Sequence, residues 1–288
     1  MTQNPASPPA RVRDAALSPT TIVARRGRTS LDLGAVWTYR ELVYFFVWRD
    51  VKVRYRQTLL GVLWAVLQPV ITMVVFTVVF GHLAGMASDG VPYPLFALAA
   101  LLPWTFFATG VSQAANSLVG NQNLLKKVYF PRLVIPLSVV LTGLVDLAVA
   151  ATVLAAMMAY YGVAPGPEAL LLLPLVLLAL LTTLSLGLWL SALNVRYRDV
   201  RYVVPFALQV WLFLTPVAYP SSVVDEPWRS LSALNPMVGV VEGVRWALLG
   251  TDTAPGRLVL VSAMTTLVLL VGGIWFFRRV EGTFADVI

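Results

Sequence analysis

Long apolar segments, separated by short polar breaks, dominate the chain. A helix needs about 20 apolar residues to cross the ~30 Å hydrocarbon core of a membrane. The segments are too long and too continuously apolar for the alternating strands of an outer-membrane barrel. The pattern therefore predicts an all-α integral membrane protein with six transmembrane helices, at residues 60–82, 94–118, 133–161, 169–194, 202–219 and 257–277.

Composition agrees with this fold class. Hydrophobic residues make up 58% of the 288 positions and charged residues only 12%, which is too apolar for a soluble domain. The chain has no cysteine. Disulfides, a thiolate metal site and a thiol nucleophile are therefore excluded.

Basic residues are distributed unevenly between the predicted loops. Of the 21 Lys and Arg residues, only Arg229, Arg245 and Arg257 fall between the fifth and sixth segments. The positive-inside rule then predicts that both termini are cytoplasmic. The net charge of +7 thus orients the protein in a membrane, and we expect no nucleic-acid partner. The other 18 basic residues lie in the N-terminal region, around 126–132 and 196–201, and at 278–279.

The region before the first apolar segment has two parts. Residues 1–36, rich in Pro, Ala, Ser, Thr and Arg, predict a disordered cytoplasmic tail before a membrane domain at 37–288. Residues 37–57 have a helical pattern with an aromatic face and a basic face, which suits a helix in the headgroup region. Alternatively, these charges serve only to fix topology. The faces comprise Tyr44, Trp48, Val51 and Tyr55, and Arg49, Lys52 and Arg56.

A polar stripe runs along the second predicted helix. Its residues recur every three or four positions, so they share one helix face. Such a stripe either lines a hydrated path or bonds neighbouring helices. Nearby aromatic residues fit lipid contact, packing or a channel lining. The stripe is Thr105, Thr109, Ser112 and Asn116, and the aromatic residues are Trp104, Phe106 and Phe107.

A basic break at 121–132 separates the second and third segments. Asn121 or Asn123 can cap a new helix, and Pro131 blocks its continuation. Pairs at i,i+4 support about two turns, or roughly 11 Å, of surface helix. This short helix suits docking of a partner, although a simple basic loop is the alternative. The pairs are Leu124 with Val128 and Leu125 with Tyr129.

Asp146 lies near the middle of the third predicted helix. An ionised carboxylate there carries a penalty of about 2.5–3.5 kcal/mol, so it should face protein or water. A proton relay would need other ionisable groups in the spans, and a hydrogen-bonded structural role is favoured. His82, the only histidine, has no metal-ligand spacing and is interpreted as an interfacial residue.

The region 219–255 remains near the outer face without a full span. Asn235-Pro236 opens a predicted helix at 237–249, and Asp225 and Glu226 separate two short apolar segments. These features fit helices that dip into the outer leaflet and return, packed against protein. A helical external cap is the alternative.

Several chemistries are missing from the sequence. It contains no Gly-x4-Gly-Lys-Ser/Thr motif, no cytoplasmic cluster of acidic residues and no second histidine. We therefore predict no catalytic site and no metal site in this chain. Any energy source must be a partner or a gradient.

Four stretches carry a combination of motifs: RDVKVRYRQTLLGVLWAVLQP (49–69), LPWTFFATGVSQAANSLVGNQNLLKKVYFPR (102–132), NVRYRDVRYVVPFALQVWLFLTPVAY (194–219) and EGTFADVI (281–288). Together they resemble the permease subunits of ABC-2 type polysaccharide exporters, which export O-antigen, capsule and teichoic acid. The resemblance runs from about residue 37 to residue 288. It implies an interface helix at 38–56, a coupling helix at 121–131 and two outer gate helices at 220–250.

The resemblance also implies partners and a location. Family permeases form homodimers in the bacterial cytoplasmic (inner) membrane and join two separate ATP-binding cassette subunits. Those subunits bind ATP and Mg²⁺, so this chain needs no cofactor of its own. The complex exports a polyprenyl-diphosphate-linked polysaccharide.

Three groups of candidate residues follow from the resemblance and from side-chain chemistry. Sugar rings stack on aromatic side chains and sugar hydroxyls bond polar ones, whereas guanidinium groups suit diphosphate. The arginines would equally satisfy the positive-inside rule alone. The ATPase-coupling candidates are Asn123, Leu124, Lys126, Lys127, Tyr129 and Phe130; the substrate-path candidates are Trp64, Trp104, Phe107, Thr109, Ser112 and Asn116; the lipid-diphosphate candidates are Arg49, Arg54 and Arg56.

Two other functions fit the same outline. A drug or lipid exporter of the same superfamily would have a narrow, purely apolar lining. A membrane-embedded polyprenyl-phosphate transferase would turn over without an ATPase, and the missing acidic metal motifs disfavour it.

Overall fold

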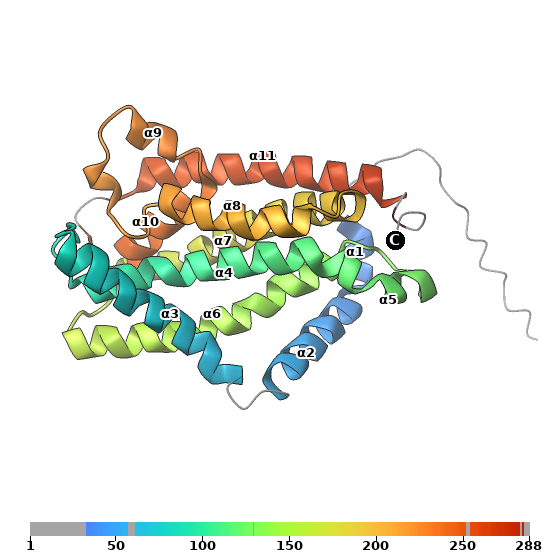
Figure 1. Cartoon of the computed structure of the whole chain (residues 1–288), viewed down its shortest axis with the longest axis horizontal. Helices are drawn as coiled ribbons and strands as arrows, with labels where there is room; N and C mark the ends of the chain where they lie inside the picture. The colour runs from blue at the N-terminus through green and yellow to red at the C-terminus, as the bar shows by residue number, and fades with distance from the viewer. Residues whose placement is uncertain (1–32, 57–60, 129, 252–253, 283, 285–288) are drawn as a thin grey trace, which may run out of the picture. The chain divides into compact units, whose positions relative to one another are not determined.

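The computed structural model describes residues 33–56, 61–128, 130–251, 254–282 and 284. Every regular element in these residues is a helix, which confirms the predicted all-α class (Figure 1). The predicted disordered tail lies outside the described residues, except for its last four positions. Those four positions belong to a short helix, α1 (Leu33–Thr38), so helical structure begins earlier than predicted.

Five segments of the described residues are long and apolar enough to cross a membrane. They confirm a multi-pass protein and match five of the six predicted spans. The segments are Val66–Leu83, Tyr93–Gly120, Val134–Tyr161, Pro167–Arg196 and Gly256–Glu281. The helices that form them are α3 (Gly61–Phe76) with η1 (Thr77–Leu83), α4 (Tyr93–Gly120), α6 (Val134–Tyr161), η2 (Pro167–Leu171) with α7 (Leu172–Arg196), and α11 (Gly256–Glu281).

The fifth predicted span, 202–219, is the one not matched, and it is shorter than expected. Its helix, α8 (Val200–Leu214), has 15 residues, or about 22 Å at 1.5 Å per residue. Residues 215–219 are not helical. The Thr215 hydroxyl donates to the Trp211 carbonyl at 3.0 Å, and Pro216 has no N–H with which to continue the helix. The carbonyls that follow bind a buried side chain instead, as described below.

α4 is the central helix of the bundle. It packs against α3, α6, α7, α8 and α10 (Pro236–Leu249). In the most apolar stretch of α4, 78% of the residues are buried inside the protein. The corresponding share is 17% for α11 and for Val66–Leu83, so most residues of those two segments lie at the surface of the bundle. Small residues bring α4 close to α7: a Cβ added at Gly110 would lie 2.6 Å from Thr183 Cγ2. α4 is therefore the frame around which the other helices are placed.

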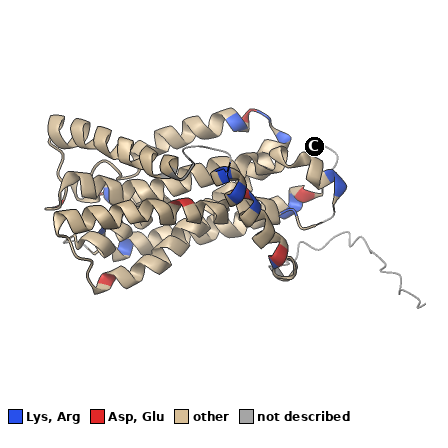
Figure 2. Cartoon of the chain, turned by 90° about the horizontal axis from the view of Figure 1, so that it is seen from below, with Lys and Arg blue, Asp and Glu red and all other residues tan. Residues whose placement is uncertain are grey.

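The two ends of the bundle differ in charge. In Figure 1, α3, α6 and α8 run toward one end, and α4, α7 and α11 run back toward the end near the C-terminus. Lys and Arg gather at this second end and along α2 (Arg40–Arg56) (Figure 2). We call it the basic end. It carries α5 (Gln122–Lys127), the turn at 197–199 and the last turn of α11.

α2 confirms the predicted helix before the first span. It packs on α6 and buries Val43 and Phe46, while Tyr44 and Trp48 of the predicted aromatic face are exposed. Tyr55 of the same predicted face is instead directed toward α6, where its hydroxyl donates a hydrogen bond to the Asp146 carboxylate.

The region after α8 forms three short helices: η3 (Ser221–Val223), α9 (Trp228–Ser232) and α10. The predicted start of α10 is confirmed, because Asn235 Oδ1 accepts a hydrogen bond from the Met237 N–H at 3.0 Å. Gly250, at φ 65°, ends the helix in the left-handed conformation. α10 is largely buried against α4, α7 and α11, whereas Trp228 of α9 is exposed.

Candidate functional site

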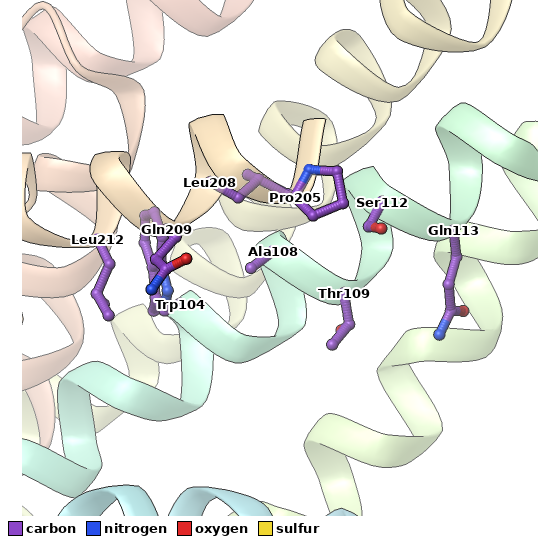
Figure 3. A pocket seen from close by; sticks show the side chains of 9 residues that line it. All are labelled: Trp104, Ala108, Thr109, Ser112, Gln113, Pro205, Leu208, Gln209 and Leu212. Atoms are coloured by element: carbon purple, nitrogen blue, oxygen red, sulfur yellow. The ribbon is translucent and has the colours of Figure 1, made fainter. Parts of the chain in front are cut away.

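An open groove of about 350 Å³ lies between α4 and α8 (Figure 3). Its α4 wall carries hydroxyl and amide groups at half-buried or exposed positions, beside the buried indole of Trp104. The α8 wall adds an amide, a proline and two leucines. The lining residues are Trp104, Ala108, Thr109, Ser112, Gln113, Pro205, Leu208, Gln209 and Leu212.

A second hollow of about 340 Å³ adjoins the groove, because Gln113 lines both. It lies where α2 meets α4 and α6. Its lining is more strongly charged than that of the groove, and it comprises Asp50, Val53, Arg54, Gln113, Val139 and Thr142. Together the two hollows lead from a charged site beside α2 to an aromatic and amide-lined site beside α8.

A cluster of four side chains lies beside the second hollow. Arg54 and Tyr55 contact the Asp146 carboxylate, and Gln113 contacts Arg54. Arg54 forms an ion pair with Asp146, and the Tyr55 hydroxyl donates to the same carboxylate. Arg54 also donates from Nη2 to Gln113 Oε1 at 2.7 Å. Burial raises the pKa of the Tyr55 phenol, and the hydrogen bond to Asp146 raises it further. The phenol therefore keeps its proton and donates it to the carboxylate in a hydrogen bond.

This cluster gives Asp146 the hydrogen-bonded surroundings expected of a structural role. The cation comes from α2, outside the spans, so the sequence of the spans alone does not predict this pair. Arg54 and Asp146 are 92 residues apart in the chain.

The residues of the polar stripe of α4 differ in their surroundings. Thr109 and Ser112 line the groove. Asn116, one turn further, instead bonds a neighbouring helix: its Oδ1 accepts from Asn194 Nδ2 of α7 at 3.2 Å. The same Asn194 amide donates to the Ala115 carbonyl at 2.9 Å.

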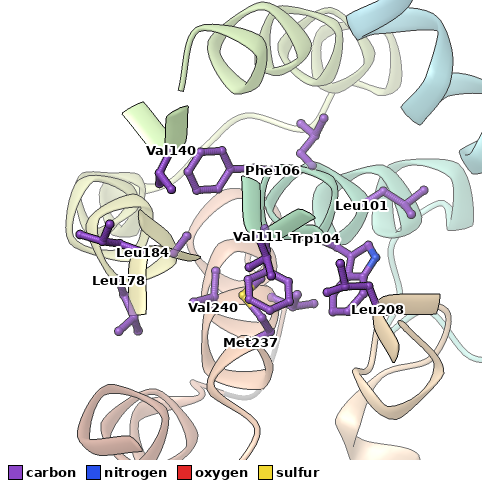
Figure 4. Close-up of a cluster of buried hydrophobic side chains, with 14 of the residues drawn as sticks. Leu101, Trp104, Phe106, Val111, Val140, Leu178, Leu184, Leu208, Met237 and Val240 are labelled. Carbon is purple, nitrogen blue, oxygen red and sulfur yellow. The ribbon is translucent and has the colours of Figure 1, made fainter. Parts of the chain in front are cut away.

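The predicted aromatic candidates separate in the structure. Trp104 lines the groove. Phe107 is fully buried, with ring centroids 5.4 Å from Trp104 and 5.5 Å from Trp211, so it packs behind the groove and does not line it. Other α4 side chains, such as Phe106, likewise enter the core (Figure 4). Trp64 is 56% exposed on α3 and lines neither hollow.

The three arginines predicted to bind the lipid diphosphate do not line one common site. Arg54 alone lines the second hollow. Arg49 pairs with its neighbour Asp50 at 2.8 Å and lies over the Phe46 ring at 4.8 Å, and Arg56 is exposed at the end of α2.

α5 forms at the predicted basic break but is shorter than two turns. It has six residues, because Val128 is already extended, and the predicted helical pair of Leu124 with Val128 does not form. Asn121 occupies the N-cap position without capping, since its side-chain amide donates back to the Ser117 carbonyl at 2.8 Å. Asn123 is exposed.

The remaining coupling candidates differ in exposure. Lys126 and Lys127 are exposed and Leu124 is half-buried. Phe130 is buried and meets the Phe46 ring of α2 edge-on, with centroids 5.8 Å apart, so it anchors the break and does not project from it. Tyr129 lies outside the described residues.

Arg245 lies in the predicted helix at 237–249, but the sequence was interpreted only through its charge, and its burial was not predicted. It is 1% exposed in α10, and its guanidinium donates to the carbonyls of Pro216 and Val217 at 2.6 Å each and to Phe96 at 3.2 Å. Glu242 pairs with it at 3.1 Å. The signal in the sequence was its spacing from Val238 and Val241, which puts an arginine on the apolar face of the helix.

These features define a multi-pass helical membrane protein with a short basic helix at one end and an open groove whose mostly apolar lining includes hydroxyl and amide groups. Residues 41–249 match the ABC-2 type transporter family, and the chain belongs to this family. Membership implies an ATP-binding partner and a membrane setting.

The chain is similar to several curated permeases over most of its length. It is 34% identical to the O-antigen export system permease protein RfbA of Myxococcus xanthus over 87% of this chain and 96% of that protein. Identity to a Klebsiella pneumoniae protein of the same name is 26%, over 83% and 92%. Identity to the polysialic acid transport protein KpsM of Escherichia coli is 25%, over 81% and 91%.

Proposed function

We propose that this chain is the transmembrane subunit of an ATP-driven exporter that moves a polyprenyl-diphosphate-linked polysaccharide across the bacterial cytoplasmic membrane. The observation that carries the proposal is the groove, whose hydroxyl, amide and indole groups suit sugars. The lining is mostly apolar, but because it includes Thr109, Ser112 and Gln209 it is not the purely apolar lining expected of a drug or lipid exporter. The names of the relatives, which refer to O-antigen and polysialic acid, support the same substrate class.

The proposed topology has six passes, with α8 as the fifth and the basic end in the cytoplasm. The positive-inside rule supports this orientation. α8 spans about 22 Å, and the non-helical residues 215–219 complete its crossing. α9 and α10 then act as outer gate helices that enter the outer leaflet and return. Both termini are cytoplasmic in this arrangement.

A second copy of the chain completes the transport path. The groove is open, and α8 exposes Phe206, Val210 and Phe213, which are suited to covering by protein. In the proposed homodimer two such grooves face one path. Two ATP-binding cassette subunits, which hold ATP and Mg²⁺, dock at α5 through Asn123, Lys126 and Lys127.

The diphosphate of the lipid carrier occupies the second hollow in this proposal. Arg54 is the donor there, because its planar guanidinium can bond two phosphate oxygens. Asp146 holds Arg54 in position until the substrate arrives. Arg49 and Arg56 contribute positive potential along α2 and do not contact the carrier directly.

Depletion of the protein in cells tests the proposed activity. We expect finished lipid-linked glycan to accumulate in the cytoplasmic leaflet while surface glycan falls, as measured by leaflet-selective labelling and mass spectrometry. Unchanged surface glycan would contradict the proposal. Loss of drug efflux with normal glycan export would favour the drug or lipid exporter, and activity of the chain without any ATPase would favour the transferase.

Reversal of the charges on α5 tests the docking surface. We expect Lys126→Glu with Lys127→Glu to weaken ATPase binding and to uncouple hydrolysis from export by fivefold or more, roughly the range of 1–3 kcal/mol couplings. Arg257→Glu, an exposed charge reversal at the opposite end, is the control. Normal binding and export by the double variant would refute an electrostatic docking role.

A further inference from the structure

The break that follows α5 is held to the C-terminal end of the chain. The Arg132 backbone N–H donates to Glu281 Oε1 at 3.2 Å, and the Arg132 guanidinium donates to the Glu281 carbonyl. The other carboxylate oxygen of Glu281 accepts from Arg278 Nη1 at 3.4 Å. Residues separated by 149 positions are thus joined through both main-chain and side-chain groups.

An aromatic contact reinforces this junction. Phe284 is 1% exposed, although it lies only four residues from the end of the chain. Its ring meets Phe277 of α11 edge-on, with centroids 5.5 Å apart, and the Arg132 guanidinium lies over it at 5.7 Å. These contacts bury Phe284 against α11 and Arg132.

α5 is placed partly by its own contacts and partly by its flanks. None of its six residues is fully buried, although Leu124 and Leu125 pack partly against the core. Only six residues, 128–133, connect it to α6. On one flank Asn121 bonds the last turn of α4, and on the other Phe130 packs on Phe46 while Arg132 binds Glu281.

We propose that Glu281 and Phe284 are positioning residues that hold residues 130–133 and thereby help to set the place of α5 for its ATP-binding partner. This inference rests on the proposed coupling role of α5. α11 packs on α7 and α10 along its length, so the bundle does not depend on the Glu281 junction. Loss of the junction should release α5 and leave the spans assembled.

The test compares Glu281→Ala and Phe284→Ala in the complete transporter with its ATPase subunits. Hydrogen exchange of the amides in 122–133 reports local opening of this segment. We expect faster exchange there, ATP hydrolysis that continues, and about fivefold or greater loss of glycan exported per ATP, the lower end of measured coupling effects. Glu281→Gln, which keeps an acceptor for the Arg132 N–H, and Phe284→Leu should restore most of both readouts.

Asp225→Ala, which removes an exposed carboxylate at the opposite end, is the matched control and should change neither readout. Unchanged exchange at 122–133 in both alanine variants would overturn the inference. So would faster exchange with normal export per ATP. Should the wild-type complex export no glycan, the proposed function fails, while the exchange measurement still decides whether Glu281 and Phe284 position α5.

Discussion

Single polar residues determine where the helices of this apolar bundle bend, end and meet. Arg245 is the clearest case, because its guanidinium satisfies the carbonyls left without partners where α8 stops. Arg54 has a comparable role between α2, α4 and α6. Both are buried or half-buried cations whose charge is balanced by a neighbouring carboxylate.

Replacement of Arg245 should make the part of the bundle around α10 unfold more readily. Arg245→Met leaves Glu242 and two carbonyls without their partner, and we expect a loss of about 3–5 kcal/mol in the free energy of unfolding. The measurement is titration with SDS in mixed micelles. Arg257→Met, at an exposed position of α11, should change stability by less than about 0.5 kcal/mol. Equal effects of the two variants would contradict this role.

A double-mutant cycle measures the coupling energy between the Arg54 and Asp146 side chains. Their side chains are 30% and 27% exposed, which limits solvent screening, so we expect a coupling energy of about 1–3 kcal/mol for Arg54→Leu with Asp146→Leu. The control cycle uses Arg49 with Asp50, where the arginine is 39% exposed, and should give about 0–1 kcal/mol. Additive effects at Arg54 and Asp146 would exclude an interacting pair.

At the scale of elements, periodicity predicts the long helices well and the short ones poorly. The apolar lengths of α4, α6 and α11 are local properties of the sequence. The end of α8 depends on Arg245, 29 residues beyond Pro216, and could not be predicted locally. The stripe of Thr109 and Ser112 followed from spacing, whereas the burial of Phe107 depends on which helix covers it.

Close contact of α10 with α11 provides an element-scale test. A Cβ at Gly239 would lie 2.7 Å from Ser262 Cβ and 2.8 Å from Val259 Cα, and the backbone atom cannot move aside without shifting α11. We expect Gly239→Ala to destabilise the protein by about 1–3 kcal/mol in the same SDS titration. Gly256→Ala, where no atom lies within 4 Å, should be neutral or slightly stabilising. The reverse order would contradict the packing.

At the scale of the whole molecule, the direction of α8 decides the topology. Because the chain lacks cysteine, a single introduced thiol reports its own side of the membrane. We expect a membrane-impermeant maleimide to label Trp228→Cys in spheroplasts and to label Arg198→Cys only after lysis. Lys127→Cys and Arg279→Cys should behave as Arg198→Cys does. Labelling of both Arg198→Cys and Trp228→Cys from outside would mean that α8 does not cross.

The pairing of Arg54 with Asp146 has a consequence for the surrounding lipid. α2 ends with Arg54 paired partway along α6, a helix of 28 residues. Charged groups at this depth are stabilised by contact with water, so water and lipid headgroups must reach inward on the flank of α2. A headgroup that follows this water has less hydrocarbon left to cross at that side of the protein.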